Sequence, residues 1–381
     1  MTFAASRPAF AWLLGLGGAI AFFLLFVLVL DRNPFTVFGA VLVGAFGSDV
    51  GLNRTIARAI PLLLLSAGLL LAFRAKFWNI GLNGAMYMGA IAASGVALYN
   101  PTAPGWLILP LMLLSALAVG AAWSLIPALL RVWFGASEII VSLMLNYVAA
   151  RIGDFLVISY WKDPNGRGFP GTATFQEGFW LPRLGSSNVH LGLLFGVVAM
   201  VAVWLVLSRT VWGLRVDLVG QGARAAQYLG ISSAAVLLAV AGVSGALGGL
   251  AGAGEVAGLN HRLEAGVTQD LGYTAILVVS LGLLRPWLTA VACLAVAGLL
   301  VGGTQVQLQF GLPSAVSGVL LWAILYGVIN AQNLAERWKG GAPPFRPAAR
   351  EGTAAAVVSR LAASSGARGP RDGLGSSERS G

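Results

Sequence analysis

Long apolar runs constrain this chain more than any other feature of its sequence. The first run, residues 9–30, is AFAWLLGLGGAIAFFLLFVLVL and carries no charge. Across all 381 residues, 57% are hydrophobic, only 10% are charged, and the mean hydropathy is +0.82. A soluble globular domain has roughly 45–50% apolar and about 25% charged residues. The sequence therefore predicts an all-α integral membrane protein and argues against a water-soluble one.

Ten segments are candidate membrane spans. A hydrocarbon core of about 30 Å requires about 20 apolar residues of helix. We expect spans at residues 9–30, 58–73, 81–99, 106–127, 138–159, 190–208, 233–252, 271–284, 286–303 and 313–330. The segments 58–73 and 271–284 are short, so they need extension by neighbouring residues, tilting or a re-entrant path.

The Lys and Arg residues near the span ends indicate an orientation. With the N-terminus in the cytoplasm, ten of them lie on the inner side and seven on the outer side. This bias agrees with the positive-inside rule, and an even number of spans then puts both termini in the cytoplasm. The longest outer connection is 161–189 and the longest inner one is 209–231. In the inner connection we expect a short helix over about 222–230, which Gly230 can end.

The end of the chain has a different composition. Residues 331–381 hold eight Lys or Arg and four Asp or Glu, which accounts for +4 of the net charge of +10. A segment rich in Ala, Gly, Ser and Pro cannot bury enough apolar surface to fold alone. We expect a transmembrane domain over 1–330 and a disordered cytoplasmic tail over 331–381. The other basic residues are scattered through loops, which favours contact with lipid headgroups over nucleic acid.

The sequence lacks the usual marks of catalysis. No Gly-x-x-x-x-Gly-Lys-Ser/Thr loop is present to hold ATP, and no Ser/His/Asp set lies within one local motif. The one cysteine, Cys293, lies in an apolar run, and the two histidines, His190 and His261, lie next to helix ends. We therefore expect no catalytic residue, metal site or cofactor on this chain, and no enzyme activity.

Polar residues inside the predicted spans are more informative. A polar or ionisable group is costly in lipid, so it normally faces a partner or a wet pathway. The candidates are Asn79, Asn83, Ser142, Asn146, Arg151, Asp154, Glu255, Asp270, Gln305, Gln307 and Gln309. Arg151 and Asp154 are three residues apart and can pair on one helix face, which is the favoured interpretation. For Asn146, helix packing and pathway lining both stay open. The three glutamines alternate with period two, which favours an extended segment.

One predicted span carries a face of small residues. Ala241, Gly245 and Gly249 recur every four residues, with Gly248 and Gly252 beside them. Small residues at this spacing let two helix backbones approach closely in a membrane. The pattern predicts tight helix packing without indicating the partner helix.

Five blocks of sequence occur in the order that one protein family shows. They are FRAKFWNIGLNGAMYMGA (73–90), SEIIVSLMLNYVAA (137–150), VGQGARAAQYLGIS (219–232), VSGALGGLAGAGEVAGLN (243–260) and LGYTAILVVSLG (271–282). Over residues 33–330 the chain resembles the membrane permeases of bacterial ABC importers for nucleosides and simple sugars. These belong to the larger group of ribose and branched-chain amino-acid permeases. Residues 139–147 look most like the nucleoside subgroup.

The resemblance implies an architecture and a set of partners. It implies a type II-importer-like permease of about ten spans in the bacterial inner membrane, working in a homo- or heterodimeric pair. Two ATPase subunits would bind on the cytoplasmic side and a solute-binding protein outside, so the ATP site lies on another chain. The connection 209–231 resembles the segment that contacts the ATPase. The residues carried over to this coupling segment are Gly220, Arg224, Ala225, Ala226, Gly230 and Ile231.

The resemblance also suggests where solute would pass. The expected lining residues of the pathway are Asn79, Asn83, Tyr87, Met144 and Asn146. Amides with an aromatic ring suit either a nucleoside or a sugar, so the substrate stays open. Residues 82–85, Leu-Asn-Gly-Ala, depart from the acid followed by Gly-Gln that the family usually has at this place. An ion-coupled secondary transporter using Glu255 and Asp270 is the main alternative, although both lie at the outer edge of the predicted spans.

Overall fold

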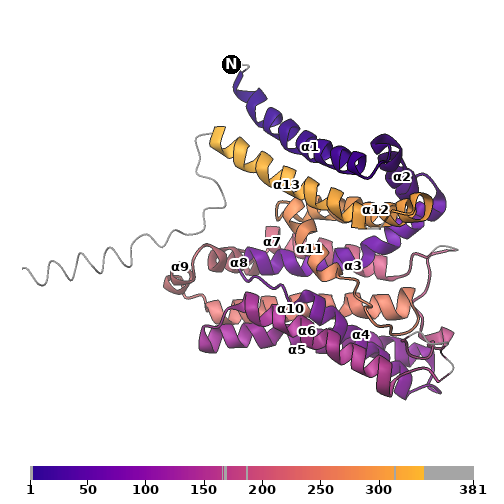
Figure 1. Cartoon of the computed structure of the whole chain (residues 1–381). Helices are drawn as coiled ribbons and strands as arrows, with labels where there is room; N and C mark the ends of the chain where they lie inside the picture. Colours follow the sequence, from indigo (N-terminus) through magenta and orange to yellow (C-terminus); the bar gives the residue numbers. More distant parts are fainter. Residues whose placement is uncertain (1–2, 165, 167–169, 186–187, 313–314, 339–381) are drawn as a thin grey trace, which may run out of the picture.

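The computed structural model of the chain describes residues 3–164, 166, 170–185, 188–312 and 315–338. In these residues the fold is helical, with two isolated β-bridges and no β-strand (Figure 1). The α-helices are α1 (Phe3–Val29), α2 (Pro34–Phe46), α3 (Asp49–Arg74), α4 (Leu82–Tyr99), α5 (Gly105–Phe134), α6 (Glu138–Phe155), α7 (Gly192–Arg209), α8 (Val211–Gln221), α9 (Ala223–Tyr228), α10 (Ser233–Gly254), α11 (Leu271–Leu281), α12 (Pro286–Phe310) and α13 (Ala315–Trp338). Short π-helical segments, Leu156–Tyr160 and Glu255–Leu259, continue α6 and α10.

Each of the ten predicted segments falls on one of these helices. Within the described residues, six helical segments are long and apolar enough to cross a membrane: Asp49–Arg74, Gly105–Phe134, Glu138–Tyr160, Gly192–Arg209, Ser233–Leu259 and Pro286–Phe310. The bent pair Leu13–Val29 and Pro34–Phe46, with an angle of 112°, would make a seventh. The helical membrane class is therefore confirmed. The count of ten spans and the cytoplasmic position of both termini stay predictions.

The two short predicted segments have different outcomes. The first is the middle and end of α3, which begins at Asp49 because Ser48 caps it by accepting a hydrogen bond from the Gly51 N–H. The second, α11, remains short at 11 residues. At about 1.5 Å per residue it spans about 16 Å, which is roughly half of a hydrocarbon core.

The helix α2 was not predicted from the sequence, and the end of α12 was predicted incorrectly. Residues 34–46 form a helix that Asn33 caps at a Pro start, and it packs against α12. Gln305, Gln307 and Gln309 are helical residues of α12, so the prediction of an extended segment was wrong. An alternation of three residues is too short to define a period, and the continuous apolar run before it carries the helix onward.

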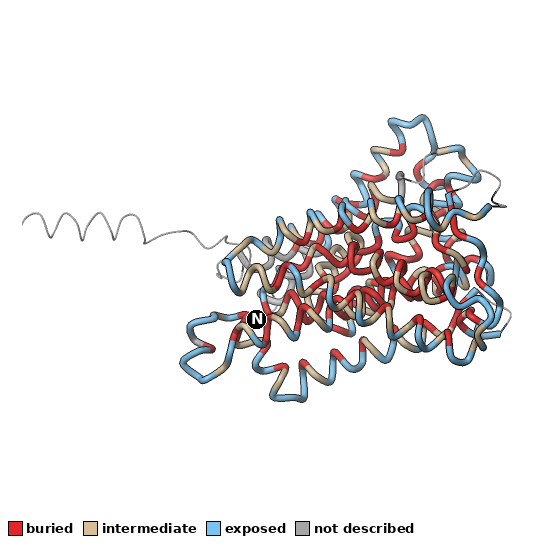
Figure 2. The backbone as a smooth tube through the Cα atoms, turned by 90° about the horizontal axis from the view of Figure 1, so that it is seen from below, coloured by how far each residue is buried: buried red, intermediate tan, exposed pale blue. Residues whose placement is uncertain are grey.

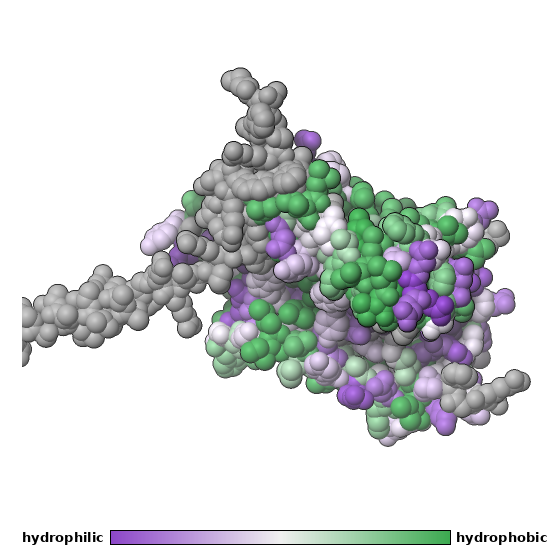
Figure 3. Space-filling view, turned by 45° about the horizontal axis from the view of Figure 1, so that its top comes forward, coloured by the Kyte–Doolittle hydropathy of each residue, from purple (hydrophilic) through white to green (hydrophobic). Residues whose placement is uncertain are grey.

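The helix α3 lies at the centre of the bundle. It contacts α2, α7, α8, α10, α11 and α12, and its residues 59–73 are buried throughout. In Figure 2 the buried backbone is concentrated in the middle of the bundle, with exposed segments around it. The outer face seen in Figure 3 has broad apolar areas, as expected of a surface in contact with lipid.

The small-residue face of α10 packs mainly against α5. A Cβ atom placed on Gly249 would lie 2.0 Å from the carbonyl oxygen of Ala116, and one on Gly245 would lie 2.3 Å from that of Gly120. Ala241 is fully buried on the same helix. The backbones of α5 and α10 therefore touch directly, which only residues without a side chain allow.

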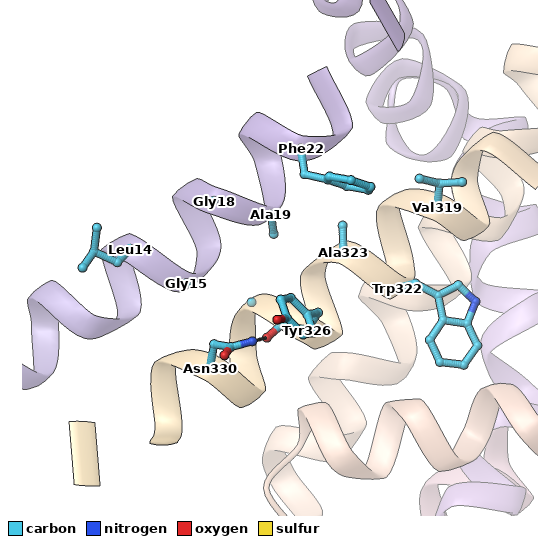
Figure 4. Close-up of a pocket in the computed structure, with 11 residues that line it drawn as sticks. Leu14, Gly15, Gly18, Ala19, Phe22, Val319, Trp322, Ala323, Tyr326 and Asn330 are labelled. Atoms are coloured by element: carbon cyan, nitrogen blue, oxygen red, sulfur yellow. Dashed lines mark hydrogen bonds between the residues drawn. The ribbon is translucent and has the colours of Figure 1, made fainter. Parts of the chain in front are cut away.

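The helices α1 and α13 form a separate pair on one side of the bundle (Figure 1). They cross where Gly15 meets Gly327, since a Cβ on Gly15 would lie 2.3 Å from the Gly327 carbonyl oxygen. A mostly apolar groove of about 610 Å³ runs beside this crossing, lined by residues such as Phe22 and Trp322 (Figure 4). The start of α1 and the end of α13 lie toward the same end of the molecule as α8 and α9.

The predicted tail only partly overlaps the described residues. The helix α13 continues to Trp338, so residues 331–338 are helical. Residues 339–381 lie outside the described part of the chain.

Candidate functional site

The connection between α3 and α4 turns back into the bundle. Lys76 takes a left-handed conformation (φ 52°), and Asn79 is completely buried. The Asn79 side chain accepts a hydrogen bond from the Gly81 N–H (3.1 Å), and its amide lies 3.4 Å from the Ser244 hydroxyl of α10. Asn79 therefore fixes the shape of this connection, and its amide does not face an open space in this conformation.

Two predicted lining residues meet at the start of α11. The Asn83 side-chain oxygen accepts a hydrogen bond from the Gly272 N–H (3.2 Å), and its amide lies 3.5 Å from the Asp270 carboxylate. The Asn146 amide of α6 donates to the Tyr273 hydroxyl (3.0 Å). We call Asn83, Asn146, Asp270 and Tyr273 the central polar cluster. Tyr273 was missed by the sequence analysis, because nothing in the sequence marks one tyrosine of an apolar helix as a partner for α6.

Asn146 has further partners in the backbone of α4 and the connection before it. Its side-chain oxygen accepts from the Gly84 N–H (2.7 Å), and its amide donates to the Ile80 carbonyl (2.9 Å). A Cβ atom on Gly84 would lie 2.8 Å from the Asn146 oxygen, so the contact requires glycine there. Asn146 thus uses its oxygen and its amide on protein groups, and the geometry favours packing over exposure to solute.

The short helix α11 begins inside the bundle because the turn before it is unusual. Gln269 and Asp270 both take left-handed conformations, with φ values of 43° and 57°. This turn reverses the chain so that α11 starts beside Asn83 of α4. The first backbone N–H groups of any helix lack partners within it. Asn83 supplies one such partner, for Gly272.

The other two predicted lining residues, Tyr87 of α4 and Met144 of α6, lie on opposite sides of α6. Tyr87 is buried, with its ring 3.3 Å from where a Cβ on Gly153 would be. Met144, by contrast, is 51% exposed on the outer surface of the chain. The structure therefore brings four of the five predicted lining residues inside one chain and leaves Met144 on its surface.

The predicted coupling segment forms two helices, α8 and α9. The helix α9 ends at Tyr228, close to the predicted end, and Gly230 follows with φ 73°. The Gly230 N–H donates to the Gln227 carbonyl (2.9 Å) and the Ile231 N–H donates to that of Ala226 (3.0 Å). This is the Schellman pattern, in which glycine is favoured because the conformation is left-handed. The preceding helix α8 was not predicted.

The residues of the coupling segment differ in exposure. Ala226 is fully buried, and Gly220 and Ile231 are at least partly covered. Arg224 and Gly230 are exposed, and the side chain of Ala225 lies outside the described part. The most exposed large apolar residues are Tyr228 (92%), Val211 (67%) and Leu229 (65%), and none of them was predicted from the sequence to be exposed. Two large apolar side chains at the tip of a short helix are typical of a docking surface.

The coupling segment is fastened to the end of α3. A Cβ atom on Gly220 would lie 2.0 Å from the Arg74 carbonyl oxygen, so the backbones of α8 and α3 touch. The Arg74 guanidinium also pairs with the Asp217 carboxylate of α8, at 3.1 and 3.2 Å. A displacement of α8 would therefore move the central helix of the bundle with it.

A residue near the middle of α3 is connected to the turn before α11. The Arg58 guanidinium donates to the Gln269 side-chain oxygen (2.5 Å) and lies 3.9 Å from the Glu255 carboxylate. Glu255 is buried, and one of its oxygens has no hydrogen-bond partner within the described residues. Glu255, which was predicted at the outer edge of its span, is therefore buried where α3, the end of α10 and the turn before α11 meet.

The loops at the end opposite the coupling segment form a packed cap. The Trp180 and His261 rings stack with centroids 3.9 Å apart, and the Arg183 guanidinium lies 3.0 Å from the His261 ring nitrogen. His190 is buried, and its ring accepts a hydrogen bond from the Gly192 N–H (3.1 Å). Burial, with His261 and Arg183 nearby, lowers the pKa of His190 to about 4. His190 is therefore neutral at pH 7.

Sequence comparisons identify relatives of the chain. A family described as branched-chain amino acid transport system / permease component matches residues 51–329. The glucose ABC transporter permease protein TsgB13 of Haloferax volcanii is 33% identical over 80% of this chain and 83% of its own length. The guanosine ABC transporter permease protein NupP of Bacillus subtilis is 28% identical over 85% of this chain and 92% of its own length. The nucleoside ABC transporter permease protein NupB of Lactococcus lactis is 26% identical over 79% of this chain and 85% of its own length.

No solved structure matches the chain. The family match extends from the start of α3 to nearly the end of α13, and so includes the central polar cluster and the coupling segment. The resemblance expected from the five sequence blocks is confirmed. The chain belongs to the branched-chain amino acid transport system / permease component family, as a membrane permease subunit of an ABC transporter.

Proposed function

We propose that this permease imports a nucleoside or a related simple sugar, delivered by an extracytoplasmic binding protein and driven by ATP hydrolysis on separate ATPase chains. The observation that carries the proposal is the similarity to permeases for guanosine, nucleosides and glucose along most of the chain. A branched-chain amino-acid importer is the nearest alternative, since the family description names that substrate class.

The two ends of the bundle suggest where the partners bind. The ATPase would dock on α9, where Tyr228 and Leu229 project from the end of the molecule. The binding protein would dock on the opposite end, over the cap formed around Trp180 and His261. A second permease, either a copy of this chain or a related one, would complete the membrane part of the transporter.

The contacts along α3 support a mechanism of coupling. Closure of the ATPases would displace α9 and α8, and the contacts of Gly220 and Asp217 would pass this displacement to Arg74 of α3. Nearer its middle, α3 holds Gln269 through Arg58, so the start of α11 would move as well. A rigid helix that links two sites is a common means of changing which side of a pathway is open.

Reconstitution tests the proposal. Proteoliposomes containing the chain with its ATPase and binding-protein partners should accumulate radiolabelled guanosine, adenosine or glucose when ATP is supplied on the ATPase side. Leucine serves as the alternative substrate. Concentrative uptake by the isolated chain on a proton or sodium gradient would instead support a secondary transporter and contradict the proposal.

A further inference from the structure

Arg151 occupies an unusual position on α6. The continuous helical segment Glu138–Tyr160 has its centre at residue 149, so Arg151 lies about 3 Å beyond the centre at 1.5 Å per residue. The Arg151 side chain is 84% exposed. Arg58 is also close to the middle of its span, but it is only 16% exposed and has partners within the chain. Arg151 is the exposed charge nearest the middle of a candidate span among the described residues.

Contact with lipid does not explain this position. In a core about 30 Å thick, a centred helix would place Arg151 about 12 Å from the nearer hydrocarbon edge. An arginine in hydrocarbon at this depth is costly, and its side chain reaches the membrane surface most easily from near a helix end. Within the described residues the guanidinium has one partner, the Asp154 carboxylate at 3.4 Å. Its remaining N–H donors therefore require water or another polar group.

The face of α6 around Arg151 is exposed along its length within this chain. The buried face of the helix is formed by Ser142, Asn146, Ala149 and Gly153, which pack toward α4 and α5. The opposite face exposes Ile140, Met144, Tyr147, Arg151, Phe155 and Ile158. A shallow groove of about 630 Å³ runs along it between Tyr147 and Leu156. Met144, the predicted lining residue that the structure leaves on the surface, lies on this face.

Other exposed helix faces lack such a charge. The exposed residues in the middle of α7, such as Val198, Val201 and Trp204, are apolar, as a lipid-facing surface requires. In Figure 1, α5 and α6 lie on the side of the bundle opposite the α1 and α13 pair. The difference in charge between α6 and α7 indicates that α6 does not face lipid.

We infer that the exposed face of α6 lines a water-filled solute pathway, closed by the second permease of the pair, and that Arg151 contacts the solute there. This inference rests on the proposed function. The guanidinium presents fixed N–H donors to oxygen acceptors of the solute. Tyr147 and Phe155, one helical turn before and after Arg151, offer flat apolar surfaces. The site fits a small neutral solute that has a ring and several hydroxyl groups.

Cysteine labelling in the assembled transporter tests the presence of water. The background is Cys293→Ala, which removes the one native thiol, a buried one. A charged, membrane-impermeant methanethiosulfonate reagent reacts with the thiolate, which forms only where water reaches the sulfur. Arg151→Cys and Met144→Cys should be labelled at least about tenfold faster than Val201→Cys, an exposed mid-span position of α7. Ala149→Cys, on the buried face of α6, is the second control.

Two results would overturn the inference. One is Arg151→Cys labelling as slowly as Val201→Cys in both the nucleotide-free and the ATP-bound transporter. The other is unchanged uptake kinetics in Arg151→Gln, which should instead lower uptake about tenfold, as loss of a charged hydrogen bond predicts. Arg151→Lys, which keeps the charge, should retain part of the activity.

The labelling result is independent of the energy source. If Arg151→Cys is labelled but ATP drives no uptake of nucleoside or sugar, the proposed function fails while the aqueous pathway stands. If ATP drives uptake and Arg151→Cys is not labelled in either state, the pathway assignment fails alone. Protection of Arg151→Cys by the transported solute would support both.

Discussion

At the scale of single residues, the structure distinguishes polar side chains that are buried and hydrogen-bonded within the chain from those that are exposed. Asn79, Asn83 and Asn146 are buried and bonded to backbone atoms or neighbouring side chains. Such groups are costly to bury in an apolar interior unless they are paired, and here each is paired. Arg151 is the contrasting case, since its side chain is 84% exposed and Asp154 is its one partner within the described residues.

The role of Asn146 in packing makes a prediction about stability. Asn146→Leu leaves the Gly84 N–H, the Ile80 carbonyl and the Tyr273 hydroxyl without this partner. We expect the free energy of unfolding to fall by about 2–4 kcal/mol, because buried groups become unsatisfied. Tyr273→Phe removes only one of the three contacts and should cost about 1 kcal/mol or less. Thermal unfolding in detergent measures both, and equal melting temperatures for the two variants would contradict the packing role.

The buried His190 makes a prediction about pH. Its pKa is about 4 in the folded protein, because of burial with His261 and Arg183 nearby, against an ordinary value of 6.5. As the pH falls, the unfolded chain binds the proton first. The contribution of His190 to stability is therefore complete above pH 6.5 and is lost progressively between pH 6.5 and 4.

The measurement is the melting temperature at pH 7.5 and pH 5. His190→Asn can keep the acceptor for the Gly192 N–H but does not titrate. Between pH 7.5 and pH 5, the free energy of unfolding of the wild type should fall by about 2 kcal/mol more than that of this variant. An equal loss in both proteins would show that His190 is protonated as readily in the folded state as in the unfolded state.

At the scale of helices, small residues decide which helices can be neighbours. The glycines of α10 bring it into direct backbone contact with α5, and Gly220 does the same for α8 and α3. Such approaches replace side-chain packing by contact between backbones, as is common in membrane bundles. The half-length of α11 follows from a different cause, the left-handed turn at Gln269 and Asp270.

The contact of α10 with α5 can be tested by adding side chains. Gly249→Leu would drive a side chain into the Ala116 carbonyl, since even its Cβ would lie 2.0 Å away. We expect the free energy of unfolding to fall by about 3 kcal/mol or more, or the protein to fail to fold, because a backbone atom cannot move aside cheaply. Gly242→Ala on the same helix is the matched control, since its Cβ would find Leu125 at 3.8 Å. This variant should be neutral or more stable by up to about 1 kcal/mol.

Yield and melting temperature in detergent compare the two variants. A Gly249→Leu protein with wild-type stability would mean that α5 and α10 are not in backbone contact.

At the scale of the whole molecule, the proposed function requires a mechanical link between two distant parts of the bundle. The coupling segment lies at one end of the bundle, and the packed cap around Trp180 and His261 lies at the other. The helix α3 connects the coupling segment to the turn before α11. The α1 and α13 pair has few contacts with the rest and lies outside this connection. The family match, residues 51–329, includes α3, α8 and α11 and leaves out α1.

The exposed tip of α9 makes a prediction about assembly. Tyr228→Ala with Leu229→Ala removes two large exposed side chains and no buried one, so the melting temperature of the chain should change little. We expect recovery of the ATPase with the permease to fall at least about tenfold, because interface aromatics contribute strongly to binding. Leu308→Ala, exposed near the end of α12, is the control and should keep the ATPase. Normal recovery with the double variant would move the docking surface elsewhere.

The sequence by itself determined the membrane class, the position of each predicted helix and the family, since apolar runs, helix caps and ordered blocks are local. It located the end of α9 for the same reason, because Gly230 acts on its own backbone. It did not determine α2, the Tyr273 contact or the exposure of Tyr228.

Only the tertiary structure decided which polar residues are buried. Asn146 and Arg151 lie five residues apart on one helix, and hydropathy treats both as polar groups in a span. The first faces α4 and is hydrogen-bonded through both its oxygen and its amide nitrogen. The second faces outward and has Asp154 as its one partner within the described residues. This difference arises because the neighbouring helices cover one face of α6 and leave the other open, a fact that depends on residues far away in the chain.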